Sequence, residues 1–479
     1  MRLLPLALAL CFAIPASTDA SAAGGQTRIA PADIAVAERL RDAALKDDTA
    51  WDFTEGLSTE IPMRMPGSAN DLKSREWVTA KFKELGFDKV WSEPVTYPVW
   101  VRRSESAEIV SPFPQKLVVT ALGNSPATPP GGLAGEIVAF PTLDALKAAA
   151  AESVRGKIVY VGARMVARQD GKDYGIGSTL RTNGPSIASG KGAAGFLLRS
   201  AGTDHERLPH TGATRFADGV APIPAAALSA PDAEQIERVL ARGQPVRVKL
   251  ALDCGMDGTY TGANVIAELR GSKQPDEYFL TGGHLDSWDL GTGAIDDAVG
   301  IGISVGAAKL IAQLPQRPAR SIRVVAWANE ESGIHGGNAY GEKHGKEVAR
   351  AVLGSESDLG ADRIYKMSAT VKPESRDALA QIAAVLKPLG IDYDTQFQGK
   401  GGADLAAMHK AGMAAVSMHR DATRYFAWHH TANDTLDKID PEQLRQNVAA
   451  YAVLAYLAAQ ADGDFGSKPG AFVGQDKKN

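Results

Sequence analysis

The fold is decided by one strand–loop–helix stretch, residues 278–310, which reads YFLTGGHLDSWDLGTGAIDDAVGIGISVGAAKL. It opens with Tyr278–Gly282, an apolar run of the length typical of a buried strand. It closes with an apolar stripe at helical spacing, made by Val299, Ile303 and Leu310. The polar loop between strand and helix carries His284, Asp286 and Asp296. This stretch predicts one unit of an α/β sheet with functional side chains at the strand end.

The same order of strand, polar loop and helix recurs along the chain, and it predicts an α/β fold. Further short apolar runs predict strands at Ile322–Ala328, Ala351–Gly354 and Ala414–Met418. Strands that alternate with helices favour a mostly parallel central sheet flanked by helices. Ligands bind such sheets beyond the carboxyl ends of the strands. The acid and imidazole side chains expected at those ends are His284, Asp286, Asp296, Glu330, Glu331, Asp358 and His430.

This set of side chains indicates metal chemistry, although each member alone has a simpler explanation. A single His or Asp after a strand is more often a helix cap or a solvated loop residue. The adjacent Glu330 and Glu331 could equally form an exposed acidic turn. Together, however, imidazole and carboxylate groups are the ligands of catalytic zinc, and many carboxylates in one cleft repel one another unless divalent cations neutralise them. The set therefore predicts two metal ions about 3.5–4 Å apart, an arrangement that suits hydrolysis.

The composition describes a globular protein and excludes several classes. The chain has 479 residues, of which 23% are charged and 44% hydrophobic, so most of it has enough apolar content to fold. Lys and Arg number 52 against 56 Asp and Glu, which gives a net charge of −4. We therefore expect no nucleic-acid partner. The Gly and Pro residues follow no period, which excludes a collagen-like chain.

The first residues have the features of a secretory signal peptide. Arg2 provides the positive charge, Leu3–Ile14 the apolar segment and Ala20-Ser21-Ala22 the cleavage site. We assign residues 1–23 to this peptide and expect an exported protein, either periplasmic or secreted. After cleavage Cys254 would be the only cysteine, so we expect no disulfide bond within the chain. No later apolar run reaches the ~20 residues of a membrane span, so we expect no membrane association after cleavage.

Changes of pattern divide the mature chain into parts. Residues 24–129 begin helical, with a helix over Asn70–Leu85, and then become extended. Residues 130–253 form a separate α/β insert, and residues 254–462 form the main domain, followed by a tail at 463–479. The last helix of the main domain begins at Asp440-Pro441. The strands expected in the insert are Gly135–Phe140, Lys157–Val161, Ala194–Leu198 and Val246–Leu250.

Several motifs, taken in order, make the chain resemble a known family. The motifs are Gly283-His284-Leu285-Asp286-Ser287-Trp288-Asp289, Gly293-Ala294-Ile295-Asp296-Asp297, Asn329-Glu330-Glu331, Glu356-Ser357-Asp358 and His430-Thr431-Ala432-Asn433-Asp434-Thr435, with Pro209-His210-Thr211-Gly212 in the insert. This ordered set resembles that of the dizinc exopeptidases, which include bacterial aminopeptidases and glutamate carboxypeptidases, and within them that of the carboxypeptidase Q (plasma glutamate carboxypeptidase) group. The resemblance extends over residues 30–460.

The resemblance implies two Zn²⁺ ions per chain in a zinc exopeptidase fold. His284 and Asp358 would bind one ion. Glu331 and His430 would bind the other, and Asp296 would bridge the two. The insert at residues 130–253 would be a protease-associated domain that covers the mouth of the active site.

The resemblance also implies the catalytic residues. Glu330 would be the general base that takes a proton from the water between the metals and passes it to the leaving amine. Asp286 would hydrogen-bond His284 and so determine its tautomer. A cis peptide bond is expected between Asp296 and Asp297, with both Asp296 oxygens directed into the cluster. A homodimer is one assembly that the family suggests.

Some assignments stay open at the level of sequence. Either His429 or His430 could be the ligand, and His430 better fits the family pattern of a histidine, a Ser or Thr, two residues and an acid. The substrate would be a dipeptide or short peptide with free termini, or, as in aminopeptidases, a peptide with a free amine alone. The candidates for contact with a substrate carboxylate are Arg181, His210 and Arg424, with His429 as a further neighbour of the substrate.

Two other classes of function share this fold. One is a non-catalytic binding protein of the receptor type, which has lost the metal site; the complete ligand set argues against it. The other is an acyl transferase of the glutaminyl-cyclase type, which uses one zinc; the insert and the bridging set argue against it. A count of two metals rather than one per chain would separate the second alternative from a dizinc peptidase.

Overall fold

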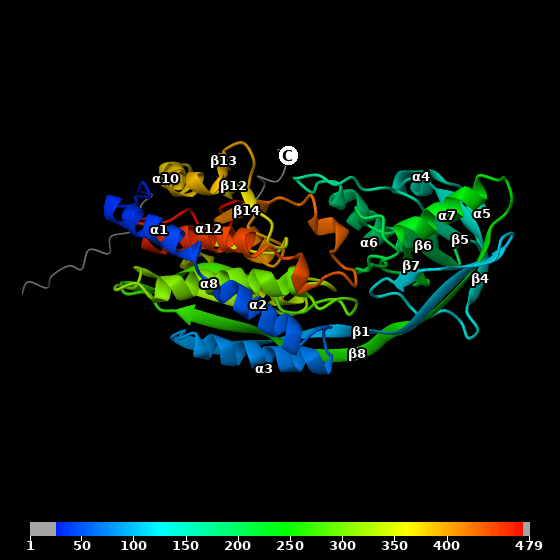
Figure 1. The fold of residues 1–479 in the computed structure, drawn as a ribbon, viewed down its shortest axis with the longest axis horizontal. Helices are drawn as coiled ribbons and strands as arrows, with labels where there is room; N and C mark the ends of the chain where they lie inside the picture. Colours follow the sequence, from blue (N-terminus) through cyan, green and yellow to red (C-terminus); the bar gives the residue numbers. More distant parts are fainter. Residues whose placement is uncertain (1–24, 473–479) are drawn as a thin grey trace, which may run out of the picture.

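The molecule consists of a larger and a smaller body, each with its own set of strands and helices. They are connected by two strands of 23 residues each, β1 (Lys89–Ser111) and β8 (Arg247–Leu269). The computed structural model describes residues 25–472. The two strands pair antiparallel from the contact of Lys89 with Glu268 to that of Ser111 with Arg247. Figure 1 shows this ribbon running from the larger body into the smaller one. The two bodies are therefore joined by continuous sheet hydrogen bonds as well as by the chain.

The larger body is built on a mixed sheet with the strand order β13-β12-β14-β11-β9-β10-β8. The central neighbours β14, β11, β9 and β10 are parallel, whereas β8 is antiparallel to β10 and β12 is antiparallel to β14. The predicted α/β class is confirmed, with the parallel part confined mainly to the centre of the sheet. The strands are β9 (Gln274–His284), β10 (Arg320–Trp327), β11 (Ala351–Glu356), β12 (Ile364–Thr370), β13 (Asp392–Asp394) and β14 (Ala415–Arg420).

Helices cover both faces of this sheet. Side chains alternate along β9, so Phe279 packs under α8 and α12, while Leu280 packs into a second core with α9 and α11. Burial of both faces explains why the central strands are almost continuously apolar. The helices of this body are α1 (Pro31–Ala44), α2 (Thr49–Glu60), α3 (Ala69–Glu84), α8 (Val299–Ala312), α9 (His335–His344), α10 (Arg376–Leu386), α11 (Ala406–Ala411) and α12 (Pro441–Gln460).

The smaller body has its own strands in the order β4-β5-β6-β7-β3, and it joins the larger sheet where β4 pairs with β8. All four strands expected in the insert are present, and β7 is an addition to them. Strand β3 belongs to this body although it precedes residue 130, and β8 continues past residue 253 without a break. The elements are β2 (Gln115–Leu117), β3 (Val119–Ala121), β4 (Leu133–Phe140), α4 (Leu143–Ala148), α5 (Ala151–Val154), β5 (Ile158–Val161), α6 (Tyr174–Gly190), β6 (Gly195–Arg199), β7 (Ala225–Leu228) and α7 (Ala230–Leu240).

Local signals in the sequence account for the ends of several helices. The predicted helix over Asn70–Leu85 is α3, and Gly86 follows it with a φ of 81°. Helix α12 begins as predicted, because the Asp440 side chain accepts hydrogen bonds from the N–H groups of Glu442 and Gln443. These two helix predictions are confirmed.

Some predictions concern residues that the structure does not describe. Residues 1–23, which are predicted to be a signal peptide, lie outside the described residues, as does the end of the tail from residue 473. Within residues 25–472 the one cysteine is Cys254, which is buried and has a free thiol. In the same range, no helix combines the length and the apolar composition that a bilayer crossing requires.

Candidate metal centre

The predicted ligands meet at the carboxyl ends of the four parallel strands. These strands are neighbours in the sheet, so the loops that leave them lie side by side. His284 is the last residue of β9, and the loop after β10 carries Glu330 and Glu331. Asp358 follows β11, and His430 lies between β14 and α12. The fold thus brings together residues that are far apart in the sequence.

The cluster has two halves, one around His284 and one around His430, and Asp296 lies between them. It lies in the turn Ala294–Ala298, where its own backbone is not helical, and its peptide bond to Asp297 is cis, which confirms that prediction. Its Oδ1 atom is 3.1 Å from Nε2 of His284, and its Oδ2 atom is 3.3 Å from Nε2 of His430. Each carboxylate oxygen therefore faces a different histidine, as a ligand that bridges two metals requires.

Asp358 and Glu331 complete the two halves. An oxygen of Asp358 lies 3.7 Å from Nε2 of His284, and an oxygen of Glu331 lies 3.0 Å from Nε2 of His430. Donor atoms of His284, Asp296 and Asp358 all lie within 4.8 Å of one another, close enough to hold a single ion. The structure therefore places all five predicted ligands in one cluster.

His429 lies beside His430 and is a second candidate for the same half. Its Nε2 atom is 3.5 Å from Oδ2 of Asp296, and the two imidazole rings stack with centroids 3.5 Å apart. Donor atoms of Asp296, His429 and His430 also lie within 4.8 Å of one another. Among the described ion pairs, however, it is His430 that contacts Glu331. This contact supports His430, whose role as the ligand stays a prediction.

The donor set suits zinc. It consists of imidazole nitrogens and carboxylate oxygens, which are the zinc ligands of catalytic sites. Oδ2 of Asp296 is buried and accepts no hydrogen bond from any residue between 25 and 472. A buried carboxylate oxygen without a donor is costly, and a cation would relieve that cost. The residues that would hold metal are His284, Asp296, Glu331, Asp358 and His430.

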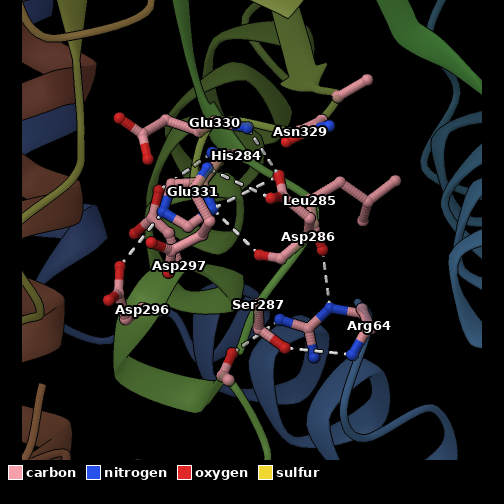
Figure 2. A network of polar contacts seen from close by, with 12 residues as sticks. Arg64, His284, Leu285, Asp286, Ser287, Asp296, Asp297, Asn329, Glu330 and Glu331 are labelled. Carbon is pink, nitrogen blue, oxygen red and sulfur yellow. Dashed lines mark hydrogen bonds and ion pairs between the residues drawn. The ribbon is translucent and has the colours of Figure 1, made fainter. Parts of the chain in front are cut away.

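Asp286 supports the site through both its backbone carbonyl and its carboxylate. Nδ1 of His284 lies 2.9 Å from the backbone carbonyl of Asp286, whereas the nearest oxygen of the Asp286 carboxylate is 3.8 Å away. The predicted hydrogen bond between Asp286 and the imidazole is therefore present, and it is made by the backbone carbonyl. This contact determines the tautomer of His284 and leaves Nε2 free for a metal. The carboxylate instead accepts hydrogen bonds from the backbone N–H groups of Glu330 and Glu331, at 2.9 and 3.2 Å (Figure 2). These N–H groups follow the end of β10 and would otherwise lack a partner.

Glu330 differs from its neighbour Glu331 in where its carboxylate lies. The Glu330 side chain lines a cavity and makes no hydrogen bond with any residue in the described part of the chain. Burial raises the pKa of Glu330 well above its usual value, and the negative charges of Asp358 and Glu331 add to this effect. A carboxylate with a raised pKa is a better proton acceptor.

The other titratable groups of the cluster influence one another strongly. Burial opposes protonation of His284, but the hydrogen bond to Asp296 and the charge of Asp358 outweigh it and raise the His284 pKa well above 6.5. Burial also opposes protonation of His430, while Glu331 and Asp296 raise its pKa to about 9. The excess of carboxylates over histidines makes this a site for cations.

A loop of the smaller body supports the loop that carries His430. The N–H of Thr211 donates to the carbonyl of His430 at 3.0 Å, and the carbonyl of Thr211 lies 3.2 Å from Nδ1 of His430. His210 donates from Nδ1 to the carbonyl of His429 at 2.7 Å. The sequence motif around His210 gave no indication of this role. The smaller body thus orients the second histidine as Asp286 orients the first.

The cluster opens into a cavity of about 510 Å³ between the two bodies. Arg181, one of the predicted substrate contacts, lines it, and so does His429. His210 is buried behind the loop, and Arg424 pairs with an aspartate away from the cavity, so neither lines it. Arg215 is a cavity residue that the sequence did not indicate. Residues of the smaller body that line the cavity are Asn124, Tyr174, Arg181, Thr182, Ala213, Thr214, Arg215 and Phe216.

Comparison with known proteins identifies the family. The sequence model of peptidase family M28 matches residues 264–455, a range that contains every predicted ligand and both predicted catalytic residues. Carboxypeptidase Q from Homo sapiens is 34% identical over 407 residues, which cover 85% of this chain and 84% of that protein. Carboxypeptidase Q from Mus musculus is 33% identical over 406 residues, with the same coverage of both chains. The chain belongs to peptidase family M28.

Solved structures agree with this assignment. A peptidase M28 precursor from Shewanella amazonensis SB2B is 44% identical, with a TM-score of 0.89 over 91% of this M28 peptidase and 99% of that chain. An aminopeptidase from Aneurinibacillus sp. strain AM-1 is 20% identical, with a TM-score of 0.62 over 90% of this chain and 98% of that one, and it shares the fold. The protein is thus a zinc metallopeptidase related to carboxypeptidase Q and to aminopeptidases.

Proposed function

We propose that this M28 peptidase binds two zinc ions and hydrolyses the peptide bond of dipeptides or short peptides with free termini. The observation that carries the proposal is the orientation of Asp296, whose two oxygens face His284 and His430 separately. When bound, two zinc ions would polarise the substrate carbonyl and make water acidic enough to attack at neutral pH.

A residue of the chain itself would accept and donate the proton in this reaction. Glu330 accepts a proton from the attacking water and donates it to the amine that leaves when the C–N bond breaks. Its carboxylate is free for this task because Asp286 binds the backbone of Glu330 and Glu331 and so keeps the turn in place. Glu331 points to His430 instead, which suits a metal ligand.

The size and charge of the cavity support a small substrate with charged ends. A volume of about 510 Å³ lies in the range of small-molecule sites. The carboxylates around the metal centre suit an α-ammonium group. Arg181 and Arg215, which both line the cavity, suit an α-carboxylate. In this proposal the smaller body is a protease-associated domain that closes the cavity, and the protein acts outside the cytoplasm after removal of residues 1–23.

A substrate panel tests the proposal. The zinc-loaded protein is given a free dipeptide, its N-acetyl derivative and its C-terminal amide, and the metal content is counted in parallel. We expect hydrolysis of the free dipeptide and two zinc ions per chain. Equal rates for the acetylated compound would refute the need for a free amine, and equal rates for the amide would refute the need for a free carboxylate. One zinc per chain would favour the single-zinc acyl transferase.

A further inference from the structure

Arg64 is a wholly buried cation next to the metal centre. It lies between α2 and α3, and its exposed fraction is 0%. The hydrogen bonds of its side chain all go to backbone carbonyls, and no carboxylate of residues 25–472 forms an ion pair with it. Burial of a charge without a paired charge is costly, so a specific arrangement must compensate for it.

The guanidinium group joins two loops (Figure 2). Its Nε atom donates to the carbonyl of Leu285 at 2.7 Å. Its Nη1 atom donates to the carbonyl of Thr292 at 2.8 Å, and Nη2 donates to that of Gly293 at 2.7 Å. The rigid fork of arginine allows one side chain to reach carbonyls on both loops.

The backbone around Arg64 strengthens the same junction. The N–H of Arg64 donates to Oγ of Ser287 at 3.0 Å, and the N–H of Ser287 donates to the carbonyl of Arg64 at 3.3 Å. Gly293 has a φ of 66°, and a Cβ at that position would lie 2.6 Å from Nη2 of Arg64. Glycine is therefore required there both for its conformation and for the close approach of the guanidinium.

Each of the two loops carries part of the metal centre. The first follows His284 directly and contains Asp286. The second leads into the turn that contains Asp296. The loop of His430 is linked to the second one, because a carboxylate oxygen of Asp434 accepts a hydrogen bond from the N–H of Ile295 at 2.8 Å. Arg64 thus contacts both the loop that follows His284 and the loop that leads to Asp296.

We propose that Arg64 is a positioning residue of the metal centre, whose guanidinium sets the distance between the loop of His284 and the loop of Asp296. Burial lowers the pKa of Arg64 to about 10, while Asp434, Asp286 and other carboxylates of the cluster oppose this effect, so the group stays charged at neutral pH. A lysine at this position would keep the charge but would donate from a single point and could not span the two loops. The inference rests on the metal site described under the proposed function.

The zinc affinity of Arg64→Lys tests this inference. The full chain is titrated against a chelator of known zinc affinity, and the absorption spectrum of the Co²⁺-substituted protein is recorded. We expect zinc affinity to fall about 10- to 100-fold, as it does when groups that orient metal ligands are lost, and the cobalt spectrum to shift. The activity of the zinc-saturated variant should show a lower kcat with a smaller change in KM.

Arg320→Lys is the matched control. Arg320 is also buried, at 4% exposed, and donates to the carbonyls of Ala461 and Gly463, but it lies at the opposite end of β10 from the metal centre. This variant should lower the unfolding temperature and leave the zinc affinity and the cobalt spectrum unchanged.

An Arg64→Lys protein with the zinc affinity and cobalt spectrum of the wild type, and only a lower unfolding temperature, would overturn the inference. If Arg64→Lys does not fold, Gly293→Ala perturbs the same contact from the other side, and wild-type zinc affinity in that variant would overturn it equally. A wild-type count of one zinc would refute the two-metal proposal, yet the comparison of the two lysine variants would still decide the role of Arg64.

Discussion

Two adjacent glutamates have different surroundings in this protein because the chain turns sharply between β10 and α9. Asn329 has a φ of 50°, in the left-handed region, just before the pair. Glu331 accepts a hydrogen bond from Nε1 of Trp288 at 2.7 Å and lies next to His430, whereas Glu330 lines the cavity. The carboxylate of Asp286 accepts hydrogen bonds from the backbone N–H groups of both glutamates and so holds this turn in place.

The proposed division between base and ligand can be tested with Glu330→Gln. Glutamine has nearly the same shape but cannot accept the proton, so kcat should fall about 10²- to 10⁴-fold while the zinc content stays that of the wild type. Glu331→Gln serves as the comparison and should lose zinc as well as activity. A loss below roughly tenfold in Glu330→Gln, with zinc retained, would exclude Glu330 as the general base.

At the scale of elements, α12 depends on its first residue. Asp440 accepts hydrogen bonds from two N–H groups of the first turn. Asp440→Ala should therefore lower the free energy of unfolding by about 1 kcal/mol, as measured in urea. Asp440→Asn keeps an acceptor at the cap and should retain most of the stability. Equal stability of the alanine variant and the wild type would show that the cap does not contribute.

The contact between β1 and α9 should depend on pH. Burial opposes ionisation of Glu93, but hydrogen bonds from His344, Trp91 and Lys343 outweigh it and lower the Glu93 pKa from 4.5 to about 2. Since the folded-state pKa is the lower one, the stabilisation is complete above about pH 4.5 and is lost as the pH falls towards 2. Glu93→Gln should lower the free energy of unfolding by on the order of 2 kcal/mol at pH 6, a figure that already allows for solvent screening of the exposed lysine.

The measurement for Glu93→Gln is urea unfolding of both proteins at pH 6 and at pH 3, with a chelator present so that metal release does not contribute. The difference between variant and wild type should shrink at pH 3. A difference that is the same at both pH values would show that Glu93 acts through packing and not through its charge.

At the scale of the whole molecule, bound metal should stabilise the fold. Zinc would bind loops from β9, β10, β11 and β14 together, and ligands that bind only the folded state stabilise it by mass action. Removal of zinc with a chelator should lower the melting temperature, with a loss of about 3 to 4 kcal/mol if free zinc had been 100 to 1,000 times its Kd. A reducing agent that does not chelate should have no effect, because Cys254 has a free thiol. An unchanged melting temperature in the presence of chelator would show that metal binding does not stabilise the fold.

The sequence by itself determined the fold class, the helix ends at Gly86 and Asp440, and the residues that line the strand ends. These features depend on local chemistry: the period of apolar residues, the conformations open to glycine and proline, and the hydrogen bonds of a capping side chain. The ordered ligand motifs are likewise local, since each follows the end of one strand. For this reason seven acid and imidazole side chains could be placed at the strand ends before any contact between them was known, whereas the choice of five ligands among them came from the resemblance to a family.

Only the tertiary structure decided which atoms form the hydrogen bonds that orient those ligands. The carbonyl of Asp286 accepts a hydrogen bond from His284, while its carboxylate accepts hydrogen bonds from the loop after β10. Arg64 donates hydrogen bonds to carbonyls that lie more than two hundred positions away in the sequence. Thr211, from the smaller body, orients His430. Hydrogen bonds to backbone carbonyls leave no signature in the type of residue that accepts them, because every residue has a carbonyl. Which carbonyl a side chain meets depends on how distant segments pack, and packing is a property of the whole fold.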